Sequence, residues 1–155
     1  MTNRTEQVCS LIDATVNAIA DPSEHRAAYI HLYGVAQCMV LLAGRRGLDP
    51  ELSRIIGLLH DIYSYRTGNS EQHAVHGAEI VREMFANELA GLFTEEEQGI
   101  IVDAIAHHSE KNAVHGPYEE LLKDADVIQR YLYDETTEGL CRTRVESTAA
   151  ELGIR

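Results

Sequence analysis

Nearly every segment of this chain repeats its apolar residues with the period of an α-helix. From Leu32 to Val40, for example, apolar side chains recur at i, i+3, i+4, i+7 and i+8, which places them on one helical face. No segment shows the two-residue alternation of a β-strand between turn residues, and neither an internal repeat nor a linker is visible. The sequence therefore predicts an all-α fold, a compact helical bundle that forms one domain over residues 1–155.

Capping signals divide this pattern into six or seven helices. Asp21-Pro22 and Asp49-Pro50 each pair a capping aspartate with a proline suited to a first helical turn. The sequence TEEE from Thr94 to Glu97 has the spacing of a capping box. The polar stretch SYRTGNSEQ after Tyr63 predicts a functional loop. The expected helices cover approximately residues 5–20, 22–46, 50–62, 73–87, 94–108, 117–133 and 138–152.

The composition limits the classes of partner. Hydrophobic residues make up 45% and charged residues 25% of the chain, which is typical of a globular protein. Thirteen Lys and Arg against 25 Asp and Glu give a net charge of −12, which disfavours binding to a nucleic acid polymer or an anionic membrane. A small phosphate-bearing ligand held by a few local cations is compatible with this charge.

Cysteine usage and the N-terminal region bear on localisation. The three cysteines are odd in number, far apart and in no Cys-x-x-Cys pair, which is typical of a reducing compartment. The opening residues lack the continuous apolar stretch of a signal peptide, and no run approaches the roughly 18–20 apolar residues of a spanning helix. We therefore expect a cytoplasmic protein without membrane contact, and the sequence leaves oligomerisation open.

Several of the eight histidines fall on or beside the apolar helical stripes. His60 continues the apolar face of its helix and is followed by Asp61, while His108 extends another stripe by one turn; His31 and His73 border two more. Burying an unpaired polar group costs about 1–3 kcal/mol, so several such groups could share a divalent metal ion. A single inward histidine is more often a hydrogen-bonded core residue, and only the ordered set favours a metal site.

This ordered set resembles the HD-domain metal-dependent phosphohydrolase superfamily. The first histidine lies in YIHLYGVA, the His-Asp pair in LLHDIY and the last aspartate in KDADVI, and the resemblance covers residues 24–134. HAVHGAE and AIAHHSE resemble motifs of the branches that bind two metals, such as the bacterial symmetrical diadenosine tetraphosphate hydrolases. The Gly-Tyr-Pro motif of the HD-GYP phosphodiesterases is absent. The resemblance implies an HD-type helical bundle.

The resemblance also implies a dinuclear site. One ion would be held by His31, His60, Asp61 and Asp126, and the second by His73 and His108, with Asp61 bridging the two as the catalytic carboxylate. Imidazole and carboxylate ligands suit Fe, Mn, Co, Ni or Zn, as one or two divalent ions.

The last aspartate has two candidates. Periodicity does not decide between Asp124 and Asp126, whereas the family pattern Ala-Asp-x-Leu/Ile matches residues 125–128 and favours Asp126. We therefore expect Asp124 to cap the helix or to support the ligands from behind.

Further residues are candidates for contacts with a substrate or for support of the ligands, although each could instead be an ordinary surface residue. Those expected to contact a phosphorylated substrate are Arg66, His107, Lys111, Lys123 and Arg130. His107 could alternatively contact an extra metal ion, and His76 could support the ligand set from one turn beyond His73.

The implied function is hydrolysis of a phosphoester or phosphoanhydride in a nucleotide-like small molecule by metal-activated water. Two alternatives belong to other classes. One is a di-iron oxygenase of the same fold, which needs a redox-active iron pair and oxygen. The other is a non-catalytic metal- or nucleotide-binding module, which predicts ligand binding without turnover. Family frequency favours the hydrolase.

Overall fold

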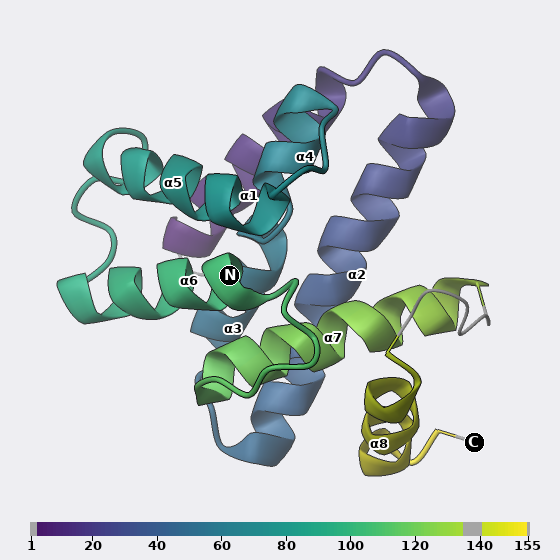
Figure 1. The fold of residues 1–155 in the computed structure, drawn as a ribbon. Helices are drawn as coiled ribbons and strands as arrows, with labels where there is room; N and C mark the ends of the chain where they lie inside the picture. The colour runs from purple at the N-terminus through teal and green to yellow at the C-terminus, as the bar shows by residue number, and fades with distance from the viewer. Residues whose placement is uncertain (1–2, 135–140, 155) are drawn as a thin grey trace.

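The computed structural model describes residues 3–134 and 141–154, and within these ranges the chain is helical with no strand. The all-α prediction is therefore confirmed (Figure 1). The helices are α1 (Asn3–Asn17), α2 (Pro22–Arg46), α3 (Pro50–Leu59), α4 (Ile62–Thr67), α5 (His73–Ala86), α6 (Glu95–His107), α7 (Pro117–Asp134) and α8 (Arg142–Leu152).

The caps form where the sequence predicted them. The Asp21 side chain accepts hydrogen bonds from the first turn of α2, and the Asp49 side chain accepts one from Leu52 N of α3. Thr94 and Glu97 form both hydrogen bonds of a capping box at the start of α6. These bonds satisfy backbone N–H groups that have no partner inside the helix, which fixes where each helix begins.

The bundle is built around α2. Helix α3 and helix α7 both pack against it, with α7 crossing it at a steep angle; α5 pairs with α6 beyond α3, and α8 packs on α7 (Figure 1). Gly57 allows the closest approach, because a Cβ atom there would lie 2.7 Å from the Cα of Ala36. This contact draws the C-terminal end of α3 toward the middle of α2.

Helix α2 is long and apolar enough, by length and composition alone, to cross a membrane, with a mean hydropathy of 1.4 in its most apolar stretch. The expectation that no such run exists was therefore wrong. In the fold, 44% of that stretch is buried, and Leu32, Val35 and Met39 are fully enclosed. Packing of α3 and α7 against this helix gives a structural reason for its apolar composition.

The helix is interrupted at His60 and Asp61, where one continuous helix was expected. Helix α3 ends at Leu59 and α4 begins at Ile62, so the first four residues of the predicted loop after Tyr63 are helical, up to Thr67, and residues 68–72 form the loop. Asp61 has a non-helical backbone with φ −107° and ψ 20°. In one continuous helix, neighbouring side chains point about 100° apart. The break lets His60 and Asp61 face the same centre.

The remaining differences lie at helix ends. Helix α1 stops at Asn17, three residues before the expected boundary at Ala20. Helix α8 begins at Arg142, and the expected start of this helix at residues 138–140 lies outside the described residues.

Candidate metal centre

Asp61 lies at the meeting point of the four predicted histidine ligands. One carboxylate oxygen, Oδ2, is 3.3 Å from Nε2 of both His31 and His60. The other oxygen, Oδ1, is 3.3 Å from Nε2 of His108 and 3.5 Å from Nε2 of His73. Five side chains thus come together from α2, α5, the C-terminal end of α6 and the junction between α3 and α4. They form two groups that share one carboxylate.

Each of these four imidazoles donates its Nδ1–H away from Asp61. The acceptors are Gln129 Oε1 for His31 (2.7 Å), the Gly57 carbonyl for His60 (2.8 Å), the Ser70 carbonyl for His73 (3.0 Å) and the Ile105 carbonyl for His108 (2.7 Å). A neutral imidazole that donates through Nδ1 keeps a lone pair on Nε2. Such outward hydrogen bonds are typical of metal-binding histidines, because they fix the ring and its tautomer.

The Nε2 lone pairs face one another in two close pairs. His31 Nε2 lies 3.2 Å from His60 Nε2, and His73 Nε2 lies 3.0 Å from His108 Nε2. With the ring protons at Nδ1, neither pair has a proton to share, so the contacts are repulsive unless a cation lies between the nitrogens and Asp61. The donor set therefore fits two divalent metal ions with imidazole and carboxylate ligands.

The electrostatics of Asp61 and His73 suit this arrangement. Burial raises the pKa of Asp61, but the imidazoles around it, His60 first and then His108 and His31, outweigh burial and hold that pKa well below the usual range. Oδ1 of Asp61 is buried without a hydrogen-bond partner. Burial lowers the pKa of His73 and so favours its neutral, ligating form.

Asp126 lies on the His31 side of the centre. Its Oδ1 is 3.6 Å from His31 Nε2 and 3.0 Å from Arg130 Nε, and its Oδ2 accepts a hydrogen bond of 2.5 Å from Lys111 Nζ. Burial raises the pKa of this carboxyl group, but Lys111 and Arg130 hold it below its usual range. Asp126 is thus an ionised carboxylate within reach of the first ligand pair, and two cations accompany it.

Asp124 points away from the ligands. Its two oxygens each lie 2.8 Å from a guanidinium nitrogen, one of Arg46 on α2 and one of Arg144 on α8. Side chains two residues apart on a helix differ by about 200° in direction, so Asp124 and Asp126 cannot share a centre. The expectation that Asp124 supports the ligands was wrong, because it joins α7 to α2 and α8 instead.

Lys123 does not reach a substrate. Its side chain is fully buried, and Nζ contacts the Ala113 carbonyl, Glu120 Oε1 and His115 Nδ1 at 2.7 to 2.9 Å. These three acceptors match the three N–H bonds of an ammonium group. The expectation that Lys123 binds phosphate was therefore wrong, and Lys123 instead fixes the loop between α6 and α7.

His107 and His76 are also directed elsewhere. His107 donates Nδ1–H to the Asp103 carbonyl and stacks on His115, with ring centroids 4.4 Å apart. His76 is exposed and contacts Glu79 at 3.2 Å. Neither ring contacts the ligand set in the described contacts, so their expected roles at the centre are not supported.

His107, Glu110 and His115 form another group close enough to hold an ion. His115 Nδ1 accepts from Lys123, which leaves its proton on Nε2, 3.4 Å from Glu110 Oε2. Both nitrogens of His115 are therefore engaged, and the group is better described as a hydrogen-bonded cluster.

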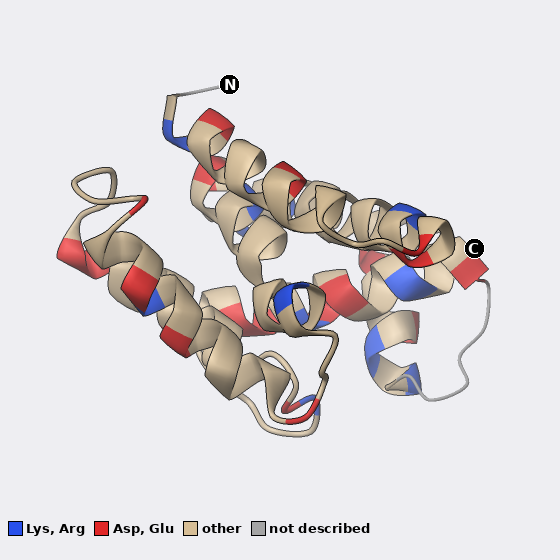
Figure 2. Ribbon diagram, turned by 90° about the horizontal axis from the view of Figure 1, so that it is seen from above, with Lys and Arg blue, Asp and Glu red and all other residues tan. Residues whose placement is uncertain are grey.

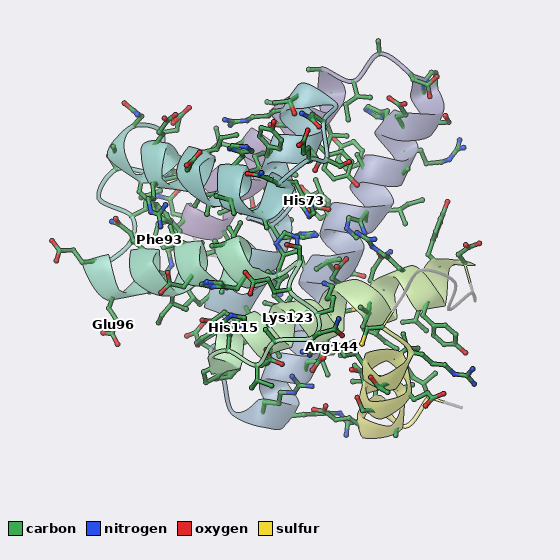
Figure 3. The ribbon with its side chains drawn as sticks, in the orientation of Figure 1. His73, Phe93, Glu96, His115, Lys123 and Arg144 are labelled. Atoms are coloured by element: carbon green, nitrogen blue, oxygen red, sulfur yellow. The ribbon has the colours of Figure 1, made fainter. Side chains whose placement is uncertain are left out.

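A cavity of about 840 Å³ opens over the centre. Asp61 and His73 form part of its wall, together with Tyr65, Arg66 and Arg130. Arg66 lines this cavity while its Nη2 lies 3.9 Å from Met84 Sδ. The cavity gives a ligand access to the site, and Figure 3 shows His73 from α5 pointing toward the space between α5 and α2.

Gln129 is a site residue that sequence reasoning missed. Its Oε1 orients His31, and a Cβ atom at Gly34 would lie 2.9 Å from its Cγ. Gly34 follows His31 by one helical turn, so a glycine inside a long helix beside a candidate ligand was the available signal.

An all-helical bundle whose imidazoles and carboxylates converge in this way has side chains able to hold a metal ion. The chain matches the family described as "HD domain" over residues 28–131, and it belongs to that family. HD domains bind divalent metal ions and are generally metal-dependent hydrolases.

The chain is also similar to proteins named Ribonuclease Y. The identity is 35% over 98 residues for the Thermus thermophilus protein and 30% over 98 residues for that of Chlorobium luteolum. These alignments cover 63% of this chain but only 15% and 17% of the two relatives. No solved structure matches the chain significantly.

Proposed function

We propose that this chain is a metal-dependent phosphohydrolase that acts on a small, nucleotide-like phosphoester or phosphoanhydride. The observation that carries the proposal is the pair of facing Nε2 lone-pair contacts around Asp61, at 3.2 and 3.0 Å. Divalent ions held there would supply Lewis acidity and lower the pKa of water.

The protein groups have separate tasks in this proposal. The four histidines and Asp61 would hold the ions, because each Asp61 oxygen lies beside one histidine pair. Lys111 and Arg130 lie against Asp126, and Arg130 also lines the cavity. Both cations would bind phosphate oxygens and offset the charge that develops on phosphoryl transfer.

Cavity size and charge favour a small substrate. A volume of about 840 Å³ is in the range of sites for cofactor-sized ligands. The net charge of −12 opposes the electrostatic attraction that a nucleic acid polymer needs. Resemblance to the symmetrical diadenosine tetraphosphate hydrolases makes dinucleoside polyphosphates the first compounds to test.

Cleavage of RNA is the second candidate, because the relatives are named Ribonuclease Y. A short single-stranded end could enter the same cavity and use the same ions. Two observations weigh against this candidate. The chain has a net negative charge, and it spans only a small part of the length of those relatives.

A substrate panel under anaerobic conditions tests the proposal. The chain is loaded with Mn²⁺ and offered mononucleotides, dinucleoside tetraphosphates, simple phosphate diesters and a short RNA, with chromatography of products. We expect turnover of a small phosphate compound and none in Asp61→Asn. Cleavage of RNA alone would select the second candidate. Turnover that requires iron and oxygen would select the oxygenase, and no turnover with any metal would support a binding module.

A further inference from the structure

Helix α8 follows the part of the chain that matches the HD domain, which ends at residue 131. Arg144 in its first turn is nevertheless only 14% exposed at its side chain and turns toward the bundle. Figure 3 shows Arg144 at the junction of α7 and α8, and Figure 2 shows basic segments of α8 next to α7. Helix α8 is therefore tied to the bundle, although it lies outside the residues that match the family.

Arg144 uses its guanidinium to join two elements. Nη1 donates to Asp124 Oδ1 and Nη2 donates to Glu120 Oε2, both at 2.8 Å, which anchors the group on α7. Its Nε donates to the backbone carbonyl of Lys111, also at 2.8 Å, in the loop between α6 and α7. A planar guanidinium can make these three directed bonds at once, which an ammonium on a flexible stem cannot reproduce.

The side chain of Lys111 points away from Arg144 and toward Asp126 in the candidate metal centre. Its Nζ donates to Asp126 Oδ2 at 2.5 Å, and the side chain is 21% exposed. One residue is thus held at its backbone by Arg144 and at its ammonium group by a predicted metal ligand. The Arg144 bond to the Lys111 carbonyl and the bond from Lys111 N–H to the Ser109 carbonyl, at 2.9 Å, together fix where the side chain starts.

We propose that Arg144 is a positioning residue: it holds the backbone of Lys111 so that the ammonium group of this lysine reaches Asp126. Helix α8 thereby contributes to the geometry of the site without touching a ligand. The consequence for turnover rests on the proposed function, whereas the placement of Lys111 does not.

Arg46 supplies a matched control. It also binds Asp124 at 2.8 Å and α8, through Glu151 at 2.7 Å, but its described contacts include no residue of the Lys111 loop. Arg46→Ala therefore weakens the same helix and removes one partner from the same aspartate while leaving the Lys111 bond in place.

The experiment measures acetylation of Lys111 by acetic anhydride in the full chain without metal, with site-resolved mass spectrometry and a surface lysine of a reference protein as internal standard. We expect Arg144→Ala to raise the Lys111 rate about three- to tenfold, the equivalent of one lost hydrogen bond. Arg46→Ala should leave it within about twofold, and Arg144→Lys should stay folded without restoring protection. Thermal unfolding of each variant shows which samples are folded at the labelling temperature.

Two results would overturn the proposal: an unchanged Lys111 rate in folded Arg144→Ala or Arg144→Lys, or an equal rise in Arg46→Ala. If a substrate is found, Arg144→Ala should raise KM more than it lowers kcat, and the effect should vanish in a Lys111→Ala background. Absence of turnover in the wild type would remove the phosphohydrolase proposal, while the labelling result would still decide the role of Arg144.

Discussion

His73 and His108 direct their Nε2 atoms at each other across 3.0 Å, while each ring donates its Nδ1–H to a backbone carbonyl. Two acceptors so close are stable only when a proton or a metal ion lies beside them. Since the Nδ1 bonds occupy the single proton of each neutral ring, a second proton would have to make one ring cationic. Burial lowers the pKa of His73 and opposes that protonation, so a metal ion is the better partner.

Metal binding should therefore stabilise the protein. We expect about two divalent ions per chain by elemental analysis, and a melting temperature that rises with the concentration of Mn²⁺ or Zn²⁺. At a hundredfold excess over Kd, binding adds about 2.7 kcal/mol to the free energy of unfolding. His108→Ala should retain one ion, because His31 and His60 are unaffected. Unchanged melting over the whole metal series would contradict the site.

Asp126 and Asp124 should give opposite phenotypes when each is changed to asparagine. Asp126→Asn removes a charge beside His31, and we expect lower metal content. Asp124→Asn removes one of two ionised partners from each of Arg46 and Arg144, and we expect normal metal content with a loss of about 1–3 kcal/mol in stability. Metal analysis and chemical denaturation of both proteins separate the two roles; a reversed pattern would reassign the ligand.

Lys123→Met should affect stability and not substrate affinity. The substitution removes the side-chain donor of the Ala113 carbonyl and one of the donors of Glu120, and we expect a cost of about 2–4 kcal/mol by urea unfolding. At a temperature where the variant is folded, KM should match the wild type. A raised KM with unchanged stability would restore the phosphate-binding role.

Acid should destabilise the junction of α7 and α8 through Glu120. Burial raises the pKa of this carboxyl group, but hydrogen bonds from Lys123 and Arg144 outweigh it and lower the pKa from its usual 4.5 to about 2. A depressed folded-state pKa gives stability that is present above pH 4.5 and is lost as pH falls toward 2.

Denaturation of wild type and Glu120→Gln at several pH values measures this effect. With screening of a partly exposed group, we expect a contribution of about 1–2 kcal/mol at pH 7. The variant should be less stable at neutral pH and should lose less stability between pH 5 and pH 3. Parallel curves for the two proteins would count against a role for Glu120.

Arg130→Ala should weaken substrate binding once a substrate is known. Arg130 is 49% exposed, lines the cavity and lies 3.0 Å from Asp126. Its removal therefore takes a cation from the cavity wall and few packing contacts from the core. We expect KM to rise about tenfold with near-normal stability, the size of one charge-assisted hydrogen bond. Equal KM values in the two proteins would remove Arg130 from the substrate site.

Local patterns in the sequence were enough to predict the helices. The cap at Asp21 and the capping box at Thr94 formed as expected, because each depends on residues within one turn of the chain. The apolar stripes likewise placed His60 and His108 inside, where they are buried. Motif resemblance named the HD domain for the same reason: its ligands recur in order along the chain.

Directions of long polar side chains were decided only by the tertiary structure. Lys123 and Lys111 both looked like phosphate ligands, yet one is enclosed by His115 and Glu120 while the other reaches Asp126. The break after Leu59, which turns Asp61 toward the histidines, was likewise invisible to periodicity.

Periodicity and caps act over one or two helical turns, and the sequence by itself therefore determined an all-helical fold with an ordered set of inward imidazoles. Which charges meet depends on contacts between residues as far apart as Arg46 and Glu151 or Lys111 and Asp126. Those contacts form only when the helices pack, because a flexible charged side chain takes the nearest partner that packing leaves within its reach.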